Sequence, residues 1–179
     1  MAKKAKARPK KTASKKPVVK KVQSIPKGYH SVTAYLSIRD AGQALEYYKK
    51  AFGAKELLRM QGPDGKVGHA EIQIGDSHVM MADESPNMGF LGPLSRGGTT
   101  VQLMIYVRDV DGTVDKAVAA GGKLKRAVEN QFYGDRSGTI EDPFGHVWTI
   151  ATHVEDVPPA EMRRRSEEAM KKMGSGGVS

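Results

Sequence analysis

Apolar and polar residues alternate at the start of the chain's patterned region, and this alternation predicts a β-strand. Every second position is apolar at Val32, Ala34, Leu36 and Ile38, which is the period of a strand with two different faces. Asp40 and Gln43 then stand where the N-cap and the third residue of a helix belong, and Gly53 ends that helix. Three further strands are predicted at residues 55–61, 67–74 and 78–82.

The same order of elements returns in the second half of the chain. A strand is predicted over residues 101–107, and Asp109 precedes a helix over residues 110–120. Asp40 matches Asp109 at an offset of 69 residues. Farther along, the offset drifts by one residue and matches Glu71 with Glu141, before Met80 realigns with Thr149. Two tandem βαβββ modules, at about residues 31–83 and 100–153, are the simplest account, and they predict an α+β fold.

The segments outside the two modules have a different composition. Residues 1–28 contain eleven Lys or Arg and no Asp or Glu, so we expect a disordered tail that makes weak, nonspecific contact with nucleic acid or another polyanion. Residues 83–98 are rich in Gly, Pro and Ser and are predicted to link the modules. Residues 154–179 form an extension in which Pro159 opens a predicted helix.

Charge and composition exclude several classes of protein. The chain has 179 residues and a net charge of +9, but without residues 1–28 it holds 18 basic and 20 acidic residues. The basic character therefore belongs to the tail, and residues 29–153 form one mildly acidic domain. The absence of cysteine excludes disulfides, thiolate metal sites and cysteine nucleophiles. No run approaches the roughly 18 apolar residues of a membrane helix, and no secretory signal is apparent, so we expect a cytoplasmic protein.

Several motifs and their spacing resemble one known superfamily. They are EYYKKAFGA, DGKVGHAEIQIGDS and QFYGDRSGTIEDPFGHVWTIATH, the last with Asp-Pro-Phe-Gly before the final strand. Together with the tandem βαβββ modules, they resemble the vicinal oxygen chelate superfamily, in its glyoxalase/bleomycin-resistance branch with the PhnB-like proteins. The resemblance covers residues 31–153. It implies a cup-shaped mixed sheet with the helices outside, a small organic ligand in the cup, and a homodimer.

Metal-using members of this superfamily place four ligands on the first and last strand of each module. Carried over by motif position, these sites fall on Thr33, Met80, Gln102 and Thr149. Only Gln102 offers an ordinary ligand atom, so we expect the usual metal centre to be absent and predict no cofactor. His69 and Glu71, with His78 on the neighbouring strand, form a weaker alternative for a displaced divalent metal. The competing interpretation is that these three are hydrated polar residues of the cup.

Ligand-binding candidates follow from strand parity and from the loop near the expected mouth of the cup. Because side chains alternate along a strand, the candidates on the predicted strands share the face that points away from the helices. In the loop, Arg136 could pair with an anion and Tyr133 could stack on a ring, although both could simply anchor the loop. No catalytic residue is assigned. The predicted ligand-binding residues are Thr33, Tyr35, Gln102, Met104, Tyr106, Tyr133, Arg136 and Thr149.

Three functions remain open at this stage. The leading hypothesis is binding of a small organic molecule without the usual metal centre, which leaves open whether the protein is an enzyme. The first alternative is a metal-dependent lyase, isomerase or dioxygenase of the same superfamily, which should copurify with metal and lose activity to a chelator. The second is a nucleic-acid-associated protein, and it rests on residues 1–28 alone.

Overall fold

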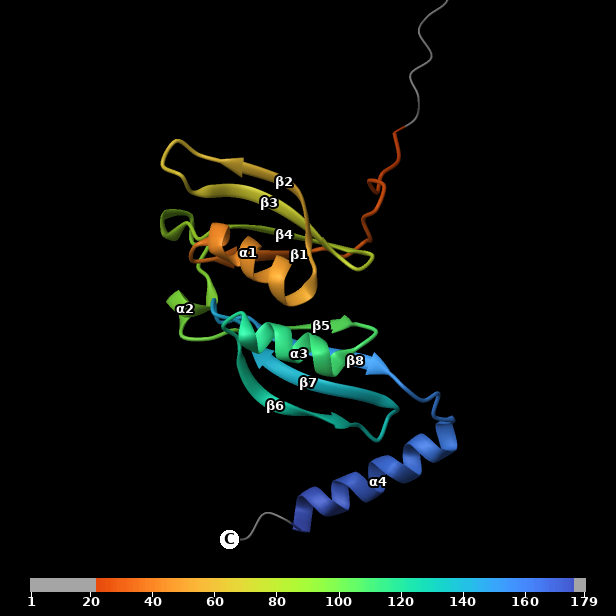
Figure 1. Cartoon of the computed structure of the whole chain (residues 1–179). Coiled ribbons are helices and arrows are strands. Elements are labelled where there is room, and N and C mark those ends of the chain that lie inside the picture. The colour runs from red at the N-terminus through yellow and green to blue at the C-terminus, as the bar shows by residue number, and fades with distance from the viewer. Residues whose placement is uncertain (1–21, 176–179) are drawn as a thin grey trace, which may run out of the picture.

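Two βαβββ modules make up the body of the molecule (Figure 1). The computed structural model describes residues 22–175. The first module contains β1 (Ala34–Ile38), α1 (Ala41–Phe52), β2 (Lys55–Gln61), β3 (Val67–Ile74) and β4 (Ser77–Asp83). The second contains β5 (Gln102–Tyr106), α3 (Val110–Ala119), β6 (Lys123–Asn130), β7 (Asp135–Glu141) and β8 (Val147–His153). The predicted α+β class and the tandem repeat are confirmed.

Each module forms a four-stranded mixed sheet with the same topology. The strand orders are β1-β4-β3-β2 and β5-β8-β7-β6. The first and last strands of each module pair in parallel, and the remaining neighbours pair antiparallel. In the described part of the chain no strand of one module pairs with a strand of the other. The predicted mixed sheet is therefore present as two separate sheets.

The ends of the two long module helices follow from the sequence. The Asp40 carboxylate accepts a hydrogen bond from the backbone N–H of Gln43 at 3.0 Å, and Asp109 accepts one from Gly112 at the same distance. These N-caps satisfy backbone donors that have no partner inside the helix. Gly53 ends α1 with a φ of 64°, a left-handed conformation that glycine adopts without strain.

The strand register corrects the sequence match between the modules. In the structure Glu71 pairs with Met80, whereas Thr139 pairs with Thr149. Since Met80 and Thr149 are equivalent, Thr139 holds the position of Glu71, and the match of Glu71 with Glu141 is wrong. Residues 142–146 connect β7 to β8, where only residues 75–76 connect β3 to β4. This longer turn of the second module explains why the sequence match paired Glu71 with the wrong residue.

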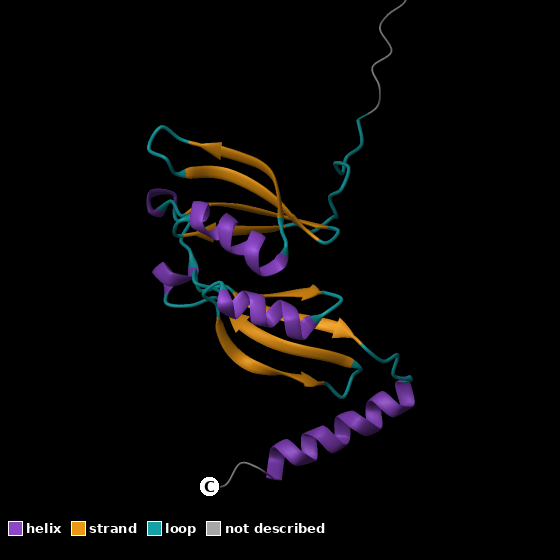
Figure 2. Ribbon diagram, viewed as in Figure 1, coloured by secondary structure: helices purple, strands orange, loops and turns teal. Residues whose placement is uncertain are grey.

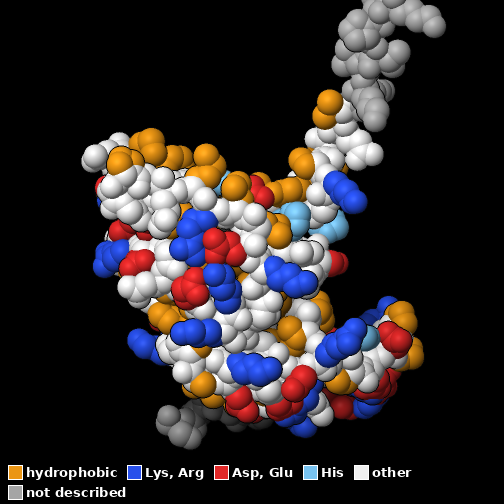
Figure 3. Space-filling model, turned by 45° about the horizontal axis from the view of Figure 1, so that its top comes forward, with side chains coloured by type: hydrophobic (Ala, Val, Ile, Leu, Met, Phe, Trp, Pro, Cys, Tyr) orange, Lys and Arg blue, Asp and Glu red, His pale blue; other side chains and the backbone are white. Residues whose placement is uncertain are grey.

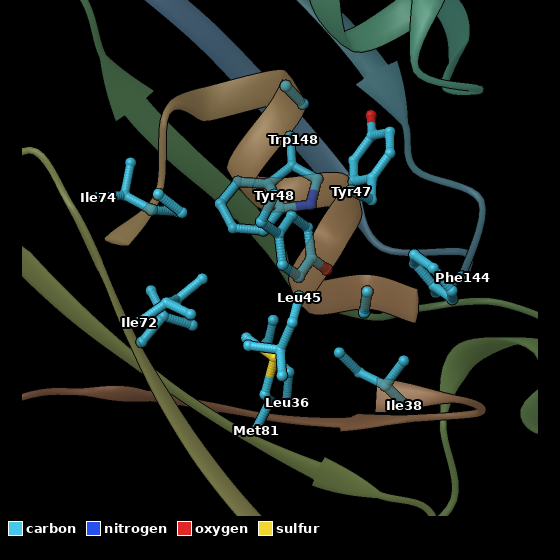
Figure 4. Packing of buried hydrophobic residues seen from close by; sticks show 14 of the residues in the cluster. Leu36, Ile38, Leu45, Tyr47, Tyr48, Ile72, Ile74, Met81, Phe144 and Trp148 are labelled. Atoms are coloured by element: carbon cyan, nitrogen blue, oxygen red, sulfur yellow. The ribbon is translucent and has the colours of Figure 1, made fainter. Parts of the chain in front are cut away.

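The helix-facing sides of both sheets meet in one shared hydrophobic core (Figure 4). The Tyr48 hydroxyl donates to Asp142 at 2.7 Å, and the indole N–H of Trp148 donates to the same carboxylate at 2.9 Å. The rings of Tyr48 and Trp148 lie 5.4 Å apart, so an α1 residue packs directly on the second module. Helices α1 and α3 lie next to each other at this junction (Figure 2). The modules therefore fold around a common interior.

The opposite sides of both sheets stay open. Tyr35 is 53% exposed, Met104 47% and Tyr106 63%, and all three lie on the edge strands β1 and β5. Hydrophobic side chains also gather along the exposed edge of the first module, where β2 lies, and they include Leu58 and Met60 (Figure 3). Exposed apolar groups on two neighbouring sheets are typical of a surface that binds something.

The segments around the modules agree only partly with the sequence predictions. The linker contains a 3-10 turn (Pro86–Met88) and α2 (Pro93–Arg96), neither of which the sequence predicted. The predicted C-terminal helix is confirmed as α4 (Pro159–Ser175). Val32, which the alternation placed in the first strand, precedes β1 and is 87% exposed, so that strand begins later than predicted.

Most of the predicted disordered tail, residues 1–21, lies outside the described residues. Between residues 22 and 175, no helix is long and apolar enough to cross a membrane.

Candidate functional site on the open sheet faces

The first open face is the side of the first sheet that points away from α1, and it includes Tyr35, Met60, His69, Glu71 and Met80. Three of its polar residues belong to one chain of hydrogen bonds. The Tyr35 hydroxyl lies 3.1 Å from Nδ1 of His69, and Nε2 of His69 lies 3.0 Å from Oε1 of Glu71. Tyr29, which precedes β1, donates its hydroxyl to the other oxygen of Glu71.

The charge on Glu71 fixes the direction of this chain. The hydrogen bond from Tyr29, followed by the one from His69, holds the pKa of Glu71 below its usual value. The same contact raises the pKa of Tyr29, which therefore keeps its proton. An ionised carboxylate only accepts hydrogen bonds, so Nε2 of His69 donates to Glu71, and in the neutral imidazole Nδ1 then accepts from Tyr35.

The segment before β1 holds Tyr29 in place. The backbone N–H of Tyr29 donates to the carbonyl of Pro26 at 3.1 Å, which closes a turn. The ring of His78 meets the Tyr29 ring edge-on, with centroids 4.3 Å apart. A Cβ on Gly28, which has a φ of 88°, would lie 2.9 Å from the His78 ring. Gly28 thus permits the close approach, and His78 supports Tyr29.

Two cavities adjoin the first open face, and Tyr35 lines both of them. The first, of about 780 Å³, lies between the face and the linker, and its other walls include Ser37, Met88 and Phe90. The second, of about 850 Å³, lies between β1 and β5 and extends to Leu103. Volumes of roughly 300–1,000 Å³ are usual for pockets that hold small organic molecules.

The second open face is the corresponding side of the second sheet, and it includes Gln102, Met104, Tyr106, Thr139 and Thr149. Tyr106 on this face belongs to a cluster of hydrogen bonds around Asp135. The hydroxyl of Tyr106 donates to Asp135 at 2.9 Å, and Nδ1 of His153 lies 2.7 Å from the other oxygen of that carboxylate. Asp135 is only 3% exposed.

Hydrogen bonds shift two pKa values in this second cluster. The contact with Asp135, and then the one with Asp156 at 3.0 Å, raise the pKa of His153 above its ordinary value. The hydrogen bond to Asp135 also raises the pKa of Tyr106. Both shifts favour the forms that donate a proton to the buried carboxylate, so the cluster is anchored around Asp135.

Other predicted ligand residues are divided between the two sides of the second sheet. Met104 pairs in register with Thr149, and Gln102 precedes them on β5, so the three share the open face. Arg136 lies on the side of α3, where its guanidinium contacts both carboxylate oxygens of Asp111, at 2.8 and 2.6 Å. It is therefore separated from the open-face residues.

The remaining two predicted ligand residues lie outside the strands. Tyr133 lies in the loop between β6 and β7, edge-on to Phe132 with ring centroids 5.2 Å apart. Thr33 directly precedes β1.

Comparison with protein families gives a match that spans almost all of both modules. Residues 29–150 match the Glyoxalase/Bleomycin resistance protein/Dioxygenase superfamily. The chain belongs to this superfamily. Its relatives include a Mycobacterium tuberculosis protein of unassigned function, 39% identical over 149 residues, which is 82% of this chain and 85% of that protein.

Solved structures also share the fold. A gene product of Arabidopsis thaliana is similar with a TM-score of 0.56 and 25% identity, over 69% of this chain and 98% of that one. The PhnB protein of Bacillus cereus is similar with a TM-score of 0.54, over 69% of this chain and 99% of that one. At 16% identity, the PhnB comparison supports the fold alone.

The chemistry of the usual ligand positions does not fit the metal centre known in this superfamily. Met80 offers a thioether, and the hydroxyl of Thr149 lies 3.3 Å from that of Thr139. The amide oxygen of Gln102 is then the single ordinary donor, which is too little for a divalent cation.

The structure also places the weaker metal candidates, His69, Glu71 and His78. Across residues 22–175, no group of three or more His, Asp or Glu side chains is arranged to hold a metal ion, and these three are no exception.

Two features of the site were not predicted from the sequence. Tyr29 lies before the first strand, and its contact with Glu71 depends on how the preceding turn packs against β4. Asp135 and His153 are register partners on β7 and β8, and neither was among the predicted ligand-binding residues. Strand parity continued from Thr139 and Thr149 by two more pairs on the same face would have found the second cluster.

Proposed function

We propose that this superfamily member binds a small organic molecule on its open sheet faces, without the usual metal centre. The observation that carries the proposal is the position of Tyr35, an exposed aromatic residue that lines two ligand-sized cavities. Aromatic and methionine side chains supply apolar contact area, and a few fixed polar groups then orient the ligand. Tyr35 and Tyr106 provide both properties, because each hydroxyl is held by a hydrogen bond.

The proposed binding unit is a homodimer in which a second copy covers the open faces. A bound small molecule usually has about 70–90% of its surface buried, and a single open sheet cannot enclose it to that extent. Exposed Met60 and Met104 offer the second copy apolar contacts on the two faces. The family's fold supports a small ligand, and the dimer is the arrangement that would enclose it.

Native mass spectrometry of the full-length protein, as purified, tests this proposal. We expect a dimer that carries a bound small molecule, and we expect elemental analysis to find no stoichiometric zinc, nickel or iron. Fluorescence titration with 8-anilinonaphthalene-1-sulfonate then measures affinity. Tyr35→Ala and Tyr106→Ala should each weaken binding about tenfold, equivalent to about 1.4 kcal/mol. Val118→Ala, which alters an exposed residue on α3, is the matched control.

Two results would contradict the proposal. Unchanged dye affinity in both tyrosine variants would move the binding surface away from the open faces. A full equivalent of metal per chain, lost from a His69→Ala and Glu71→Ala double variant, would instead support the metal-dependent alternative. A monomer that still binds the dye through Tyr35 would remove the dimer but keep the ligand site.

A further inference from the structure

We infer that Tyr35, His69 and Glu71 form a metal-independent proton-transfer site, with the Tyr35 hydroxyl as the group that exchanges a proton with the bound molecule. The inference rests on the proposed small-molecule function, and it adds a reaction to it. Its substrate class is a small carbon acid, meaning a molecule with a C–H bond weakened by a neighbouring carbonyl, nitro or ring nitrogen group.

The geometry resembles that of an activated hydroxyl. Nδ1 of His69 lies 3.1 Å from the Tyr35 oxygen, and Nε2 lies 3.0 Å from Glu71. A hydroxyl, an imidazole and an orienting carboxylate in this order allow the hydroxyl oxygen to accept a proton while its own proton moves to the ring. Tyr35 on β1 and Glu71 on β3 both pair with Met80 of β4, which lies between them. His69 lies two residues before Glu71 on the same face of β3.

Burial increases along the chain of hydrogen bonds, away from the cavities. Tyr35 is about half exposed, whereas the side chain of His69 is 25% exposed and that of Glu71 is 16% exposed. The group that meets a ligand is therefore accessible, and the groups that hold the proton are sheltered. Tyr29 occupies the second oxygen of Glu71, so the carboxylate cannot rotate away from His69 without losing that contact.

Other charged and titratable groups surround the site from several elements. His78 of β4 contacts Tyr29, and its Nδ1 is buried without a hydrogen-bond partner in the described residues. The cavity shared with Tyr35 is lined by Asp64 and Lys66, in the loop between β2 and β3, and by Asp83 and Glu84 at the end of β4. Lys66 is the one cation beside these three acidic side chains, so the cavity favours a neutral or cationic substrate over an anionic one.

The proposed step balances without an oxidant or a metal. The Tyr35 oxygen takes the proton from the substrate carbon, and the Tyr35 hydroxyl proton passes to Nδ1 of His69. The electron pair left by the C–H bond moves into the neighbouring carbonyl, nitro or ring group of the substrate. The imidazolium that forms is stabilised by the ionised Glu71. Return of the proton to the same or a neighbouring carbon gives an epimer or an isomer and restores the site.

The test uses 5-nitrobenzisoxazole as the probe and the full-length protein. Removal of its ring C–H proton breaks the N–O bond and releases the coloured 2-cyano-4-nitrophenolate, so no other reagent is needed. We expect the protein to accelerate this reaction with saturation. Tyr35→Phe should lower kcat about 100-fold with little change in KM, since the ring remains and only the hydroxyl is lost. His69→Gln should have a comparable effect.

Glu71 is a positioning residue in this scheme, so its test is spectroscopic as well as kinetic. In protein labelled with ¹⁵N-histidine, we expect His69 to hold its proton on Nε2, and Glu71→Gln to change that tautomer balance and lower kcat. Glu56→Gln is the matched control, because Glu56 lies on the helix side of the same sheet and pairs with Lys49 and Arg59. Tyr47→Phe, in the core, controls for the loss of a hydroxyl.

The outcomes separate this inference from the proposed function. Equal kcat in the parent and Tyr35→Phe proteins would overturn the proton-transfer site. Saturation-transfer NMR could instead show that the probe binds while the protein converts it no faster than free imidazole does. That result would also overturn the proton-transfer site and leave the binding function standing. Failure to bind the probe at all counts against both.

Discussion

The two modules share a framework but differ on their open faces. Equivalent buried positions keep their character, as Ile72 and Ile140 show, and both module helices begin with a capping aspartate. On the open faces, however, equivalent positions differ: Tyr35 of the first module corresponds to Met104 of the second, and Glu71 corresponds to Thr139. The repeat therefore preserves the residues that fold each module and varies those that face outward.

This difference assigns separate roles to the modules. His69 is equivalent to Ser137, whose hydroxyl is fully buried and lacks a hydrogen-bond partner within the described residues. The second module cannot repeat the Tyr35, His69 and Glu71 chain. It instead ties Tyr106 and His153 to a buried Asp135 at the far end of its sheet. The two proposals thus divide between the faces, with proton transfer on the first and binding contacts on the second.

The largest expected effect tests whether the modules share one core. Trp148 is 1% exposed and contacts Tyr48 of the other module. Trp148→Ala should cost about 3–5 kcal/mol and destabilise both modules together, since the cavity opens at their junction. Urea unfolding followed by circular dichroism measures this loss. Met104→Ala, on the second open face, should cost less than about 1 kcal/mol. Two separate transitions in the Trp148 variant would mean that the modules fold independently.

A smaller effect distinguishes the second module by its response to pH. The folded pKa of His153 is raised, so its protonated form is favoured by folding. This contribution is complete below about pH 6.5, the unperturbed value, and is lost as the pH rises through the raised pKa. His153→Gln should therefore lower Tm at pH 5.5 and have little effect at pH 8.5. His30→Gln, at an exposed position before β1, is the control. An equal drop in Tm at both pH values would contradict the assigned contact.

The smallest expected effect separates the basic N-terminal segment from the first module. Deleting residues 1–21, which contain ten Lys or Arg, should abolish salt-sensitive heparin binding and leave Tm unchanged. Deleting residues 1–30 should also remove Tyr29 from Glu71 and lower Tm by a few degrees. Differential scanning fluorimetry and heparin chromatography measure both. Heparin binding that persists without residues 1–21 would place the polyanion contact elsewhere.

Local patterns predicted most of the framework, because strands and helix caps depend on neighbouring residues. Lys55–Gln61 and Val67–Ile74 were predicted with the bounds that the structure shows, and Asp40 and Asp109 cap their helices as expected. The site was less predictable because it depends on register and on chain termini. The longer turn at residues 142–146 moved Glu141 out of the position matched to Glu71. Arg136 was expected at the mouth of the cup and lies against Asp111 instead.

The most direct test of the account is a titration that reads both open faces at once. In protein labelled with ¹³C at the methionine methyl groups, Met80 and Met104 report on the two faces, Met81 on the core and Met170 on α4. Addition of 8-anilinonaphthalene-1-sulfonate should shift the resonances of Met80 and Met104 with one dissociation constant and leave Met81 and Met170 unchanged. Shifts confined to Met170, or unchanged Met80 and Met104 signals in the presence of bound dye, would contradict binding on the open faces.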